Sequence, residues 1–311
     1  MAIAGYVIVF ICAVIALLAA FIYAAPATVV AAALQATRRQ SGLQRKEITL
    51  PSGLHFAYLE GGQGEPLLLL HGFGGNKDTF TRVARYLIAH YHVIIPDIIG
   101  FGESDHLLQA DYSSAAQVER LRELSQALNL KKLHLGGNSM GAQIALQYAS
   151  RYPTEIDSLW LLSPAVSKHS FKPEILKALT ESSGNPLIAR NVQEFQAVMA
   201  LGMYRPPYIP KPMLKVLAQE HIQNAVLEAD IFQQLLNDAL DEQIQGMQTP
   251  SLIVFGNQDR VIAAETANVL NKLLTNTQLV FVVDAGHVPM FEKPQYCAND
   301  YVSFRAALLK S

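Results

Sequence analysis

The stretch LHLGGNSMGAQIALQYAS, residues 133–150, joins a short apolar run to a segment with apolar residues at helical spacing. At the junction, Gly137-Asn138-Ser139-Met140-Gly141 matches G-x-S-x-G, in which a sharp strand-to-helix turn lifts the serine oxygen above a sheet. The helix expected from Met140 would direct its N-terminal dipole at the serine, which favours negative charge there. The alternative is a glycine-rich turn with an incidental serine, but the placement of the motif favours a nucleophile.

Two downstream loops contain a base and an acid, which a serine nucleophile needs because its free hydroxyl is weak. His287 lies in AGHVPMFEKP, after the last expected strand, and Asp259 lies in FGNQDR, after the strand before it. Both loops follow carboxyl ends of strands, where parallel sheets place their sites. Asp284 is a rival acid, although it is expected to end its own strand. The alternatives are a surface histidine for His287 and a turn residue for Asp259.

A second glycine-bearing loop, HGFGG at residues 71–75, follows the apolar run PLLLL. A backbone N–H from such a loop and the N–H after the nucleophile can converge on a developing oxyanion. We therefore predict an oxyanion hole formed by the backbone of Phe73 and Met140, with a plain glycine turn as the alternative. His71 is expected to be structural, as is Asp97 in PDIIGFGES. No His, Cys, Asp or Glu cluster has metal-ligand spacing, so no metal is expected.

Strand-like and helical patterns alternate over residues 46–311, which predicts an α/β domain with a mostly parallel, doubly wound sheet of about eight strands. The alternation stops at about residues 165–245, which contain helical segments but no convincing strand. Connections in α/β units usually span about two to six residues, so we interpret this segment as a helical cap insertion. Its apolar residues either line a binding site over the sheet edge or pack the cap onto the domain. The candidate substrate-binding residues are Phe73, Phe195, Val198 and Met199.

The N-terminus is almost wholly apolar over residues 6–25, and about 20 residues at about 1.5 Å each cover a bilayer core of about 30 Å. We predict a transmembrane anchor over residues 1–25 and a linker or juxtamembrane helix over residues 26–45. A cleaved signal peptide is the main alternative, but no Lys or Arg precedes Arg38. A buried core helix is a further alternative. Basic residues only follow the segment, which by the positive-inside rule places the catalytic domain in the cytoplasm. Cleavage would make it periplasmic or secreted.

The HGFGG, PDIIGFGES, GNSMG, GNQD and GHVPMFEKP segments resemble the α/β-hydrolase superfamily, in which the triad follows the chain order Ser, Asp, His. More closely, the chain resembles membrane-anchored bacterial lipases, sometimes called family V, and membrane-bound monoacylglycerol lipases. The resemblance implies a serine esterase with a Ser-His-Asp triad that forms an acyl-enzyme with lipid esters and needs no cofactor. Ala142, where many relatives have a third glycine, and Ile98-Ile99, where Leu-Pro is frequent, depart from the pattern outside the proposed chemistry.

Two other functions stay open at this stage. A carbon–carbon bond hydrolase of the meta-cleavage-product type would share the GNSMG segment, whereas a non-catalytic hydrolase-fold binding protein would usually lack a triad residue. The net charge of −2 gives no reason to expect nucleic acid as a partner. We expect a monomer that binds a lipid ester and associates with the membrane through its N-terminal helix.

Overall fold

The computed structural model describes the chain except for residues 1–5, 8–9, 13–16, 18–19, 181–183 and 311. Within the described residues, eight strands form one sheet in the order β1-β2-β4-β3-β5-β6-β7-β8. β2 runs antiparallel to β1 and β4, and the other neighbours are parallel. The predicted α/β-hydrolase fold with a mostly parallel sheet is therefore confirmed. The strands are β1 (Gln44–Thr49), β2 (His55–Gly61), β3 (Glu65–Leu70), β4 (Tyr91–Pro96), β5 (Leu133–Asn138), β6 (Ile156–Leu162), β7 (Ser251–Gly256) and β8 (Thr277–Val282).

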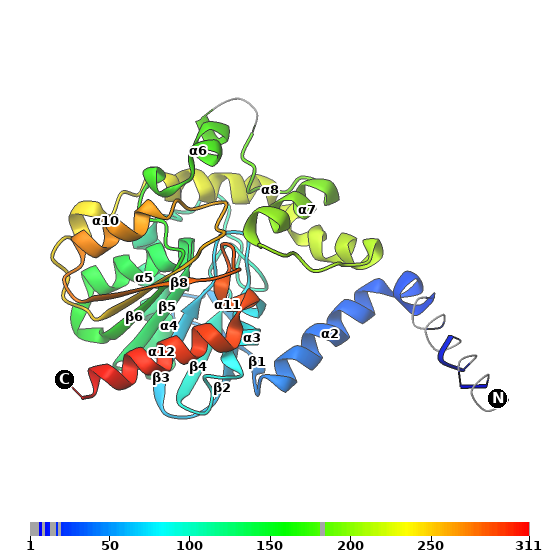
Figure 1. Cartoon of the computed structure of the whole chain (residues 1–311), viewed down its shortest axis with the longest axis horizontal. Coiled ribbons are helices and arrows are strands. Elements are labelled where there is room, and N and C mark those ends of the chain that lie inside the picture. The colour runs from blue at the N-terminus through cyan, green and yellow to red at the C-terminus, as the bar shows by residue number, and fades with distance from the viewer. Residues whose placement is uncertain (1–5, 8–9, 13–16, 18–19, 181–183, 311) are drawn as a thin grey trace.

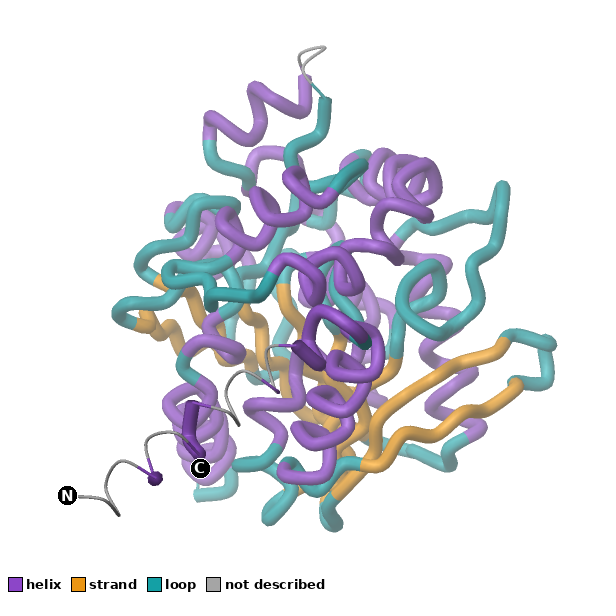
Figure 2. Tube along the Cα trace, turned by 90° about the vertical axis from the view of Figure 1, so that its right-hand side faces the viewer, coloured by secondary structure: helices purple, strands orange, loops and turns teal. Residues whose placement is uncertain are grey.

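Helices cover both faces of this sheet (Figures 1 and 2). Side chains alternate between the faces along a strand, so Leu68 and Leu70 of β3 join one apolar cluster and Leu67 and Leu69 the other. Residues of α4, α5, α8, α9 and α10 also belong to the first cluster, and residues of α3, α11 and α12 to the second. The helices of the body are α3 (Thr81–Ala84), α4 (Ser114–Ala127), α5 (Met140–Arg151), α10 (Glu265–Leu273), α11 (Pro289–Glu292) and α12 (Pro294–Leu308), with 3-10 turns η1 (Lys77–Phe80), η2 (Pro153–Glu155) and η3 (Lys168–Ser170).

The helix after β3 is shorter than the sequence pattern predicts. Apolar residues stand at helical spacing from Phe80 to Ile88, yet the α-helix there is only α3. The N–H groups of Tyr86 and Leu87 donate to carbonyls three residues back, at 3.0 and 2.8 Å, so tight turns replace further helix.

Helices also fill the long connection between β6 and β7, and they lie over the carboxyl edge of the sheet (Figure 1). This connection contains the segment predicted as a cap, whose limits as a domain stay a prediction. An isolated bridge between Phe171 and Ile262 ties it to the loop after β7. The helices are α6 (Pro173–Thr180), α7 (Val192–Gly202), α8 (Lys211–Leu236) and α9 (Asp241–Ile244).

Near the N-terminus, α2 (Pro26–Gln40) packs against α8 and α3. Arg38 at its end forms a two-point ion pair with Asp78, at 2.7 and 2.5 Å. None of the described helices combines the length and the apolar character that a membrane crossing requires. Much of the anchor predicted over residues 1–25 lies outside the described residues, so the anchor stays a prediction.

Candidate active site

Ser139 lies at the turn between β5 and α5, in a backbone conformation that residues other than glycine rarely adopt. Its φ is 53° and its ψ is −113°, which costs on the order of 1–3 kcal/mol. The flanking glycines allow this turn because any side chain there would clash with the backbone. A Cβ on Gly137 would lie only 2.3 Å from the backbone of Gly141, and a Cβ on Gly141 only 2.2 Å from the carbonyl oxygen of Leu70. The motif therefore needs glycine at both positions to bring helix and strands this close.

His287 and Asp259, both buried, are joined by a hydrogen bond of 2.9 Å between His287 Nδ1 and Asp259 Oδ2. The other carboxylate oxygen of Asp259 accepts the N–H groups of Val261 and Ile262, at 2.8 and 3.0 Å. Burial raises the pKa of Asp259, but the charge and hydrogen bond of His287 and these N–H groups together hold the pKa below its ordinary value. The carboxylate is thus kept ionised against the imidazole.

Asn138, the variable residue before the serine, connects the serine turn to the histidine loop. Its Nδ2 donates to the carbonyl oxygens of Leu162, at 3.1 Å, and His287, at 2.9 Å. The N–H of Ser139 donates to the same Leu162 oxygen at 2.9 Å. The described residues show no hydrogen bond between the Ser139 and His287 side chains, a bond that often tightens only when substrate is bound.

The two predicted oxyanion donors lie in loops that follow the paired strands β3 and β5. Met140 begins α5 directly after Ser139, and Phe73 lies in the loop after β3, whose last residue Leu70 pairs with Gly137 of β5. In the described part of the chain, the N–H groups of Phe73 and Met140 donate to no protein acceptor. Both are therefore free to bind a developing negative charge.

His71 and Asp97, which the sequence suggests are structural, hold the loops around this site. His71 is fully buried, and this burial lowers its pKa. Its Nε2 accepts the N–H of Ile98 at 3.0 Å, and its Nδ1 donates to the carbonyl oxygen of Gly72 at 2.8 Å. The Asp97 carboxylate accepts the backbone N–H and the Nζ of Lys77, each at 2.6 Å.

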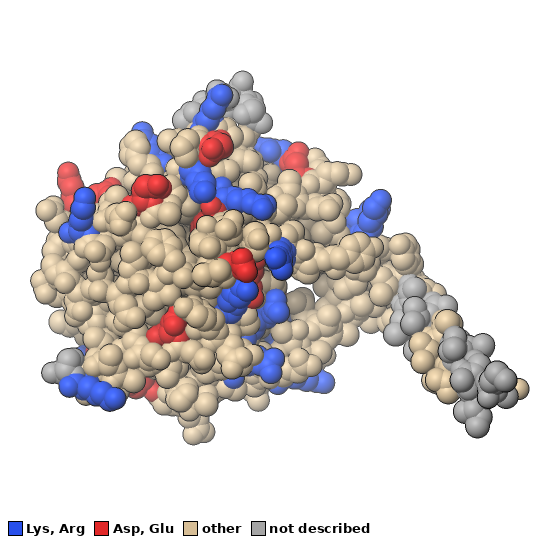
Figure 3. All heavy atoms as spheres, viewed as in Figure 1, with Lys and Arg blue, Asp and Glu red and all other residues tan. Residues whose placement is uncertain are grey.

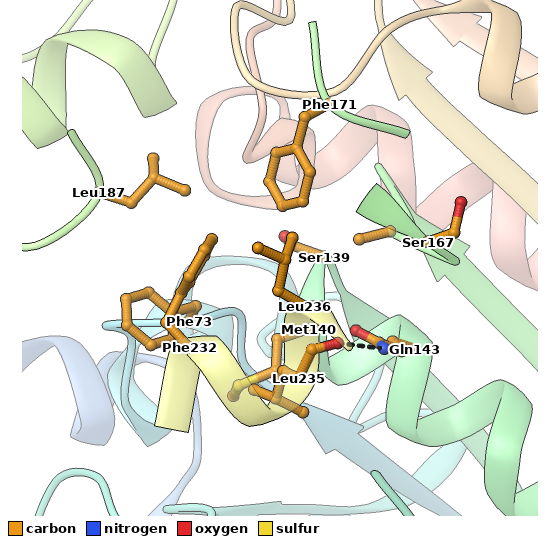
Figure 4. A pocket seen from close by; sticks show the side chains of 11 residues that line it. Phe73, Ser139, Met140, Gln143, Ser167, Phe171, Leu187, Phe232, Leu235 and Leu236 are labelled. Carbon is orange, nitrogen blue, oxygen red and sulfur yellow. Dashed lines mark hydrogen bonds between the residues drawn. The ribbon is translucent and has the colours of Figure 1, made fainter. Parts of the chain in front are cut away.

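An apolar pocket opens at Ser139 (Figure 4). Phe73 and Phe232 meet edge to face with centroids 5.1 Å apart, and Gln143 Nε2 donates to the Leu235 carbonyl at 3.2 Å, which fixes the end of α8 above α5. None of the described residues that line the pocket carries a charge. Its lining is Phe73, Ser139, Met140, Gln143, Ala165, Ser167, Phe171, Leu187, Phe232, Leu235 and Leu236.

The other predicted substrate-binding residues lie on α7, outside this lining. Phe195 instead stacks on His221 of α8, with ring centroids 5.0 Å apart and the planes inclined by 28°. Like Phe195, Val198 and Met199 are half-buried, and no described residue of α7 is fully buried. The wall beside Ser139 is built by the end of α8 and the loop after β6, so a substrate-binding role for α7 stays a prediction.

The sequence matches the family described as the alpha/beta hydrolase fold over residues 65–294. The chain belongs to the α/β-hydrolase family. This α/β-hydrolase is 44% identical to Lipase 1 of Psychrobacter immobilis, over 88% of each chain. It is 28% identical to the monoacylglycerol lipase ABHD6 of Homo sapiens, over 79% of this chain and 77% of that protein. The crystal structure of a membrane phospholipase A, described as a bacterial virulence factor, matches with a TM-score of 0.88 and 33% identity, over 99% of this chain and 100% of that one.

These matches confirm two predictions, that the chain is an enzyme of the α/β-hydrolase family and that it resembles lipases and monoacylglycerol lipases. Sequence reasoning missed Asn138 and the pocket residues of α8. Asn138 occupies a position that the motif leaves open. The pocket residues of α8 belong to a helix whose buried face is determined by how the insertion folds back over the sheet.

Proposed function

We propose that this α/β-hydrolase is a serine esterase of the lipase or monoacylglycerol lipase type, with Ser139, His287 and Asp259 as its triad. The observation that carries the proposal is the apolar pocket at Ser139, since an uncharged wall of aromatic and aliphatic side chains suits an acyl chain. The lipase relatives support the same substrate class.

In the first half of the reaction, Ser139 Oγ attacks the ester carbonyl carbon while its proton passes to His287 Nε2. Asp259 holds the ring through Nδ1 and stabilises the imidazolium that forms. The carbonyl oxygen becomes an oxyanion that the N–H groups of Phe73 and Met140 bind, each such donor contributing about 3–4 kcal/mol. The carbon–oxygen bond to the alcohol then breaks, and the alcohol leaves with the proton from His287.

In the second half, a water molecule attacks the acyl-enzyme and gives its proton to His287. The same two N–H groups bind the second oxyanion, and its collapse releases the fatty acid and returns the proton to Ser139. No cofactor enters either half, because nucleophile, base and electrostatic stabilisation all come from the chain.

The pocket favours an acyl chain by excluding it from water. Each methylene buried there would strengthen binding by about 0.8 kcal/mol, or about fourfold, until the pocket is full. Phe73 would then act twice, through its N–H at the oxyanion and through its ring at the acyl chain.

We further propose that the N-terminus, residues 1–25, anchors the enzyme in the membrane from which its substrate comes. The sequence has no charged residue before Arg38. On the face shown in Figure 3, charged side chains lie on the body, whereas those atoms of the projecting N-terminal segment that are not grey are tan. The cytoplasmic orientation and the monomeric state stay predictions.

A carbon–carbon bond hydrolase is the runner-up from sequence, and nothing among the described residues of the pocket favours it. The described lining has no charged side chain that could pair with an ionic substrate.

The proposal is tested by assaying the purified enzyme against esters of increasing chain length and against mono-, di- and triacylglycerols, beside Ser139→Ala. We expect activity that rises with chain length to an optimum in the wild type and a loss of several orders of magnitude in the folded variant. Activity confined to substrates without an ester would refute it.

A further inference from the structure

Glu292, the last residue of α11, accepts hydrogen bonds from two parts of the chain that are far apart in sequence. Its Oε1 accepts the N–H of Gly286, next to His287, at 2.6 Å. Its Oε2 accepts the N–H groups of Tyr204 and Arg205, at 2.9 and 3.2 Å, in the segment that follows α7. One half-buried carboxylate thus joins the histidine loop to the cap segment.

The two segments also touch directly. The N–H of His287 donates to the carbonyl oxygen of Gly202 at 2.9 Å. A Cβ on Gly286 would lie 2.7 Å from the Tyr204 nitrogen and 3.0 Å from the Gly202 oxygen. The backbone around the candidate catalytic histidine is therefore packed against the cap with no room for a side chain between them.

We propose that Glu292 is a positioning residue for His287, and that it acts by fastening the histidine loop to the cap segment Gly202–Arg205. Asp259 fixes the imidazole ring through Nδ1, but it does not fix the backbone that carries the ring. That backbone is held by Asn138 on the side of the sheet and by Glu292 and Gly202 on the side of the cap. The inference rests on the roles proposed above for Ser139 and His287.

A carboxylate suits this role because it accepts several N–H groups at once, and hydrogen bonds to an ionised acceptor are roughly twice as strong as neutral ones. Without it, three backbone N–H groups lose their acceptor, and the histidine loop can shift away from Ser139. A displacement of about 1 Å between reacting groups can cost about 100-fold in rate. The consequence should therefore appear in the chemical step, with little change in substrate affinity.

The experiment measures how fast a small fluorophosphonate labels the active-site serine of the full-length enzyme, together with kcat and KM for an acetate ester. Labelling requires the serine and its base but no acyl pocket, so it reports their alignment. Glu292→Ala should lower both the labelling rate and kcat by about 10- to 100-fold, with KM changed by less than about threefold. Glu292→Gln should be intermediate, because an amide oxygen can accept from one segment only.

Tyr204→Pro tests the cap side, because proline has no N–H to donate to Glu292 and puts a ring carbon where that N–H pointed. It should lower the labelling rate in the same direction as Glu292→Ala. Tyr204→Ala is its control, since it removes the side chain and keeps the N–H, and it should label like the wild type. Glu265→Ala, at an exposed glutamate of α10, controls for the loss of a negative charge and should also label like the wild type.

Near-normal labelling of folded Glu292→Ala, judged by circular dichroism, would overturn the inference. Slow labelling of Glu292→Ala together with normal labelling of Tyr204→Pro would overturn the role of the cap segment in the proposal, because Glu292 would then act through Gly286 alone. If Glu292→Ala does not fold, Glu292→Gln and Tyr204→Pro decide the matter. A wild type that is active yet not labelled at Ser139 would refute the proposed nucleophile, and the inference with it.

Discussion

Replacing Asn138 by alanine should weaken both the fold and the reaction, because this one amide joins the serine turn to the histidine loop. Asn138 is 2% exposed, and its Nδ2 bonds two carbonyl oxygens. In Asn138→Ala, the Leu162 oxygen keeps the N–H of Ser139 as a donor, so that lost bond should cost about 1 kcal/mol. The His287 oxygen loses its Asn138 donor while buried, which should cost about 1–3 kcal/mol.

The sum is about 2–4 kcal/mol, which should lower the melting temperature by about 4–8 °C at about 2 °C per kcal/mol for a domain of this size. The histidine loop would also lose one of its tethers, so kcat should fall by about 10- to 100-fold. Asn138→Asp should be worse than Asn138→Ala, since a carboxylate would face both carbonyl oxygens without a proton to donate.

The assay combines thermal and urea denaturation, each followed by circular dichroism, with kcat for a short-chain ester. Asn299→Ala, at an exposed position on α12, is the control and should change neither quantity. An Asn138→Ala variant that unfolds at the wild-type urea concentration, or that loses stability while kcat stays unchanged, would refute this role of Asn138.

Three further outcomes follow from the site and the cap. Asp259→Asn should lower kcat by about 10⁴-fold, because an amide cannot hold the required tautomer of the histidine, whereas Asp284→Asn should change it by only a few-fold; the reverse order would make Asp284 the acid. Ala165→Phe, which adds a ring to the pocket lining, should lower kcat/KM by about fourfold for each methylene it excludes and spare acetate esters; an unchanged chain-length profile would place the acyl site elsewhere. Burial lowers the pKa of His221, but its hydrogen bond to Glu228 and the nearby acidic charges outweigh this and raise the pKa above the ordinary 6.5. The pair therefore stabilises the fold fully below pH 6.5 and less as pH rises through the raised pKa, so urea titrations should show a larger loss for His221→Gln at pH 6 than at pH 9.

The sheet and the loops of the site could be predicted from sequence because both depend on local rules. Apolar runs such as PLLLL form strands that are covered on both faces, and parallel strands bring their carboxyl ends to one edge. Ser139, Asp259 and His287 follow three such ends, so the motif and two loops were enough to select them.

The pocket wall could not be predicted in the same way. Apolar residues on α7 and on α8 are equally plausible linings from their spacing alone. Phe232 reaches the pocket and Phe195 stacks on His221 because of how α8 crosses the sheet edge, which depends on contacts distant in sequence. The roles of Asn138 and Glu292 could not be predicted for a related reason, since their partners His287 and Tyr204 are remote in the chain.

The central claim, that Ser139 is acylated by a lipid ester during turnover, is tested most directly by mass spectrometry. The wild-type enzyme is mixed with a long-chain ester, quenched in acid within the first turnovers and digested. We expect a mass increase equal to the acyl group on the peptide that contains Ser139, and no such increase in Ser139→Ala. Rapid ester turnover with an unmodified Ser139 peptide, or full activity in Ser139→Ala, would contradict the account.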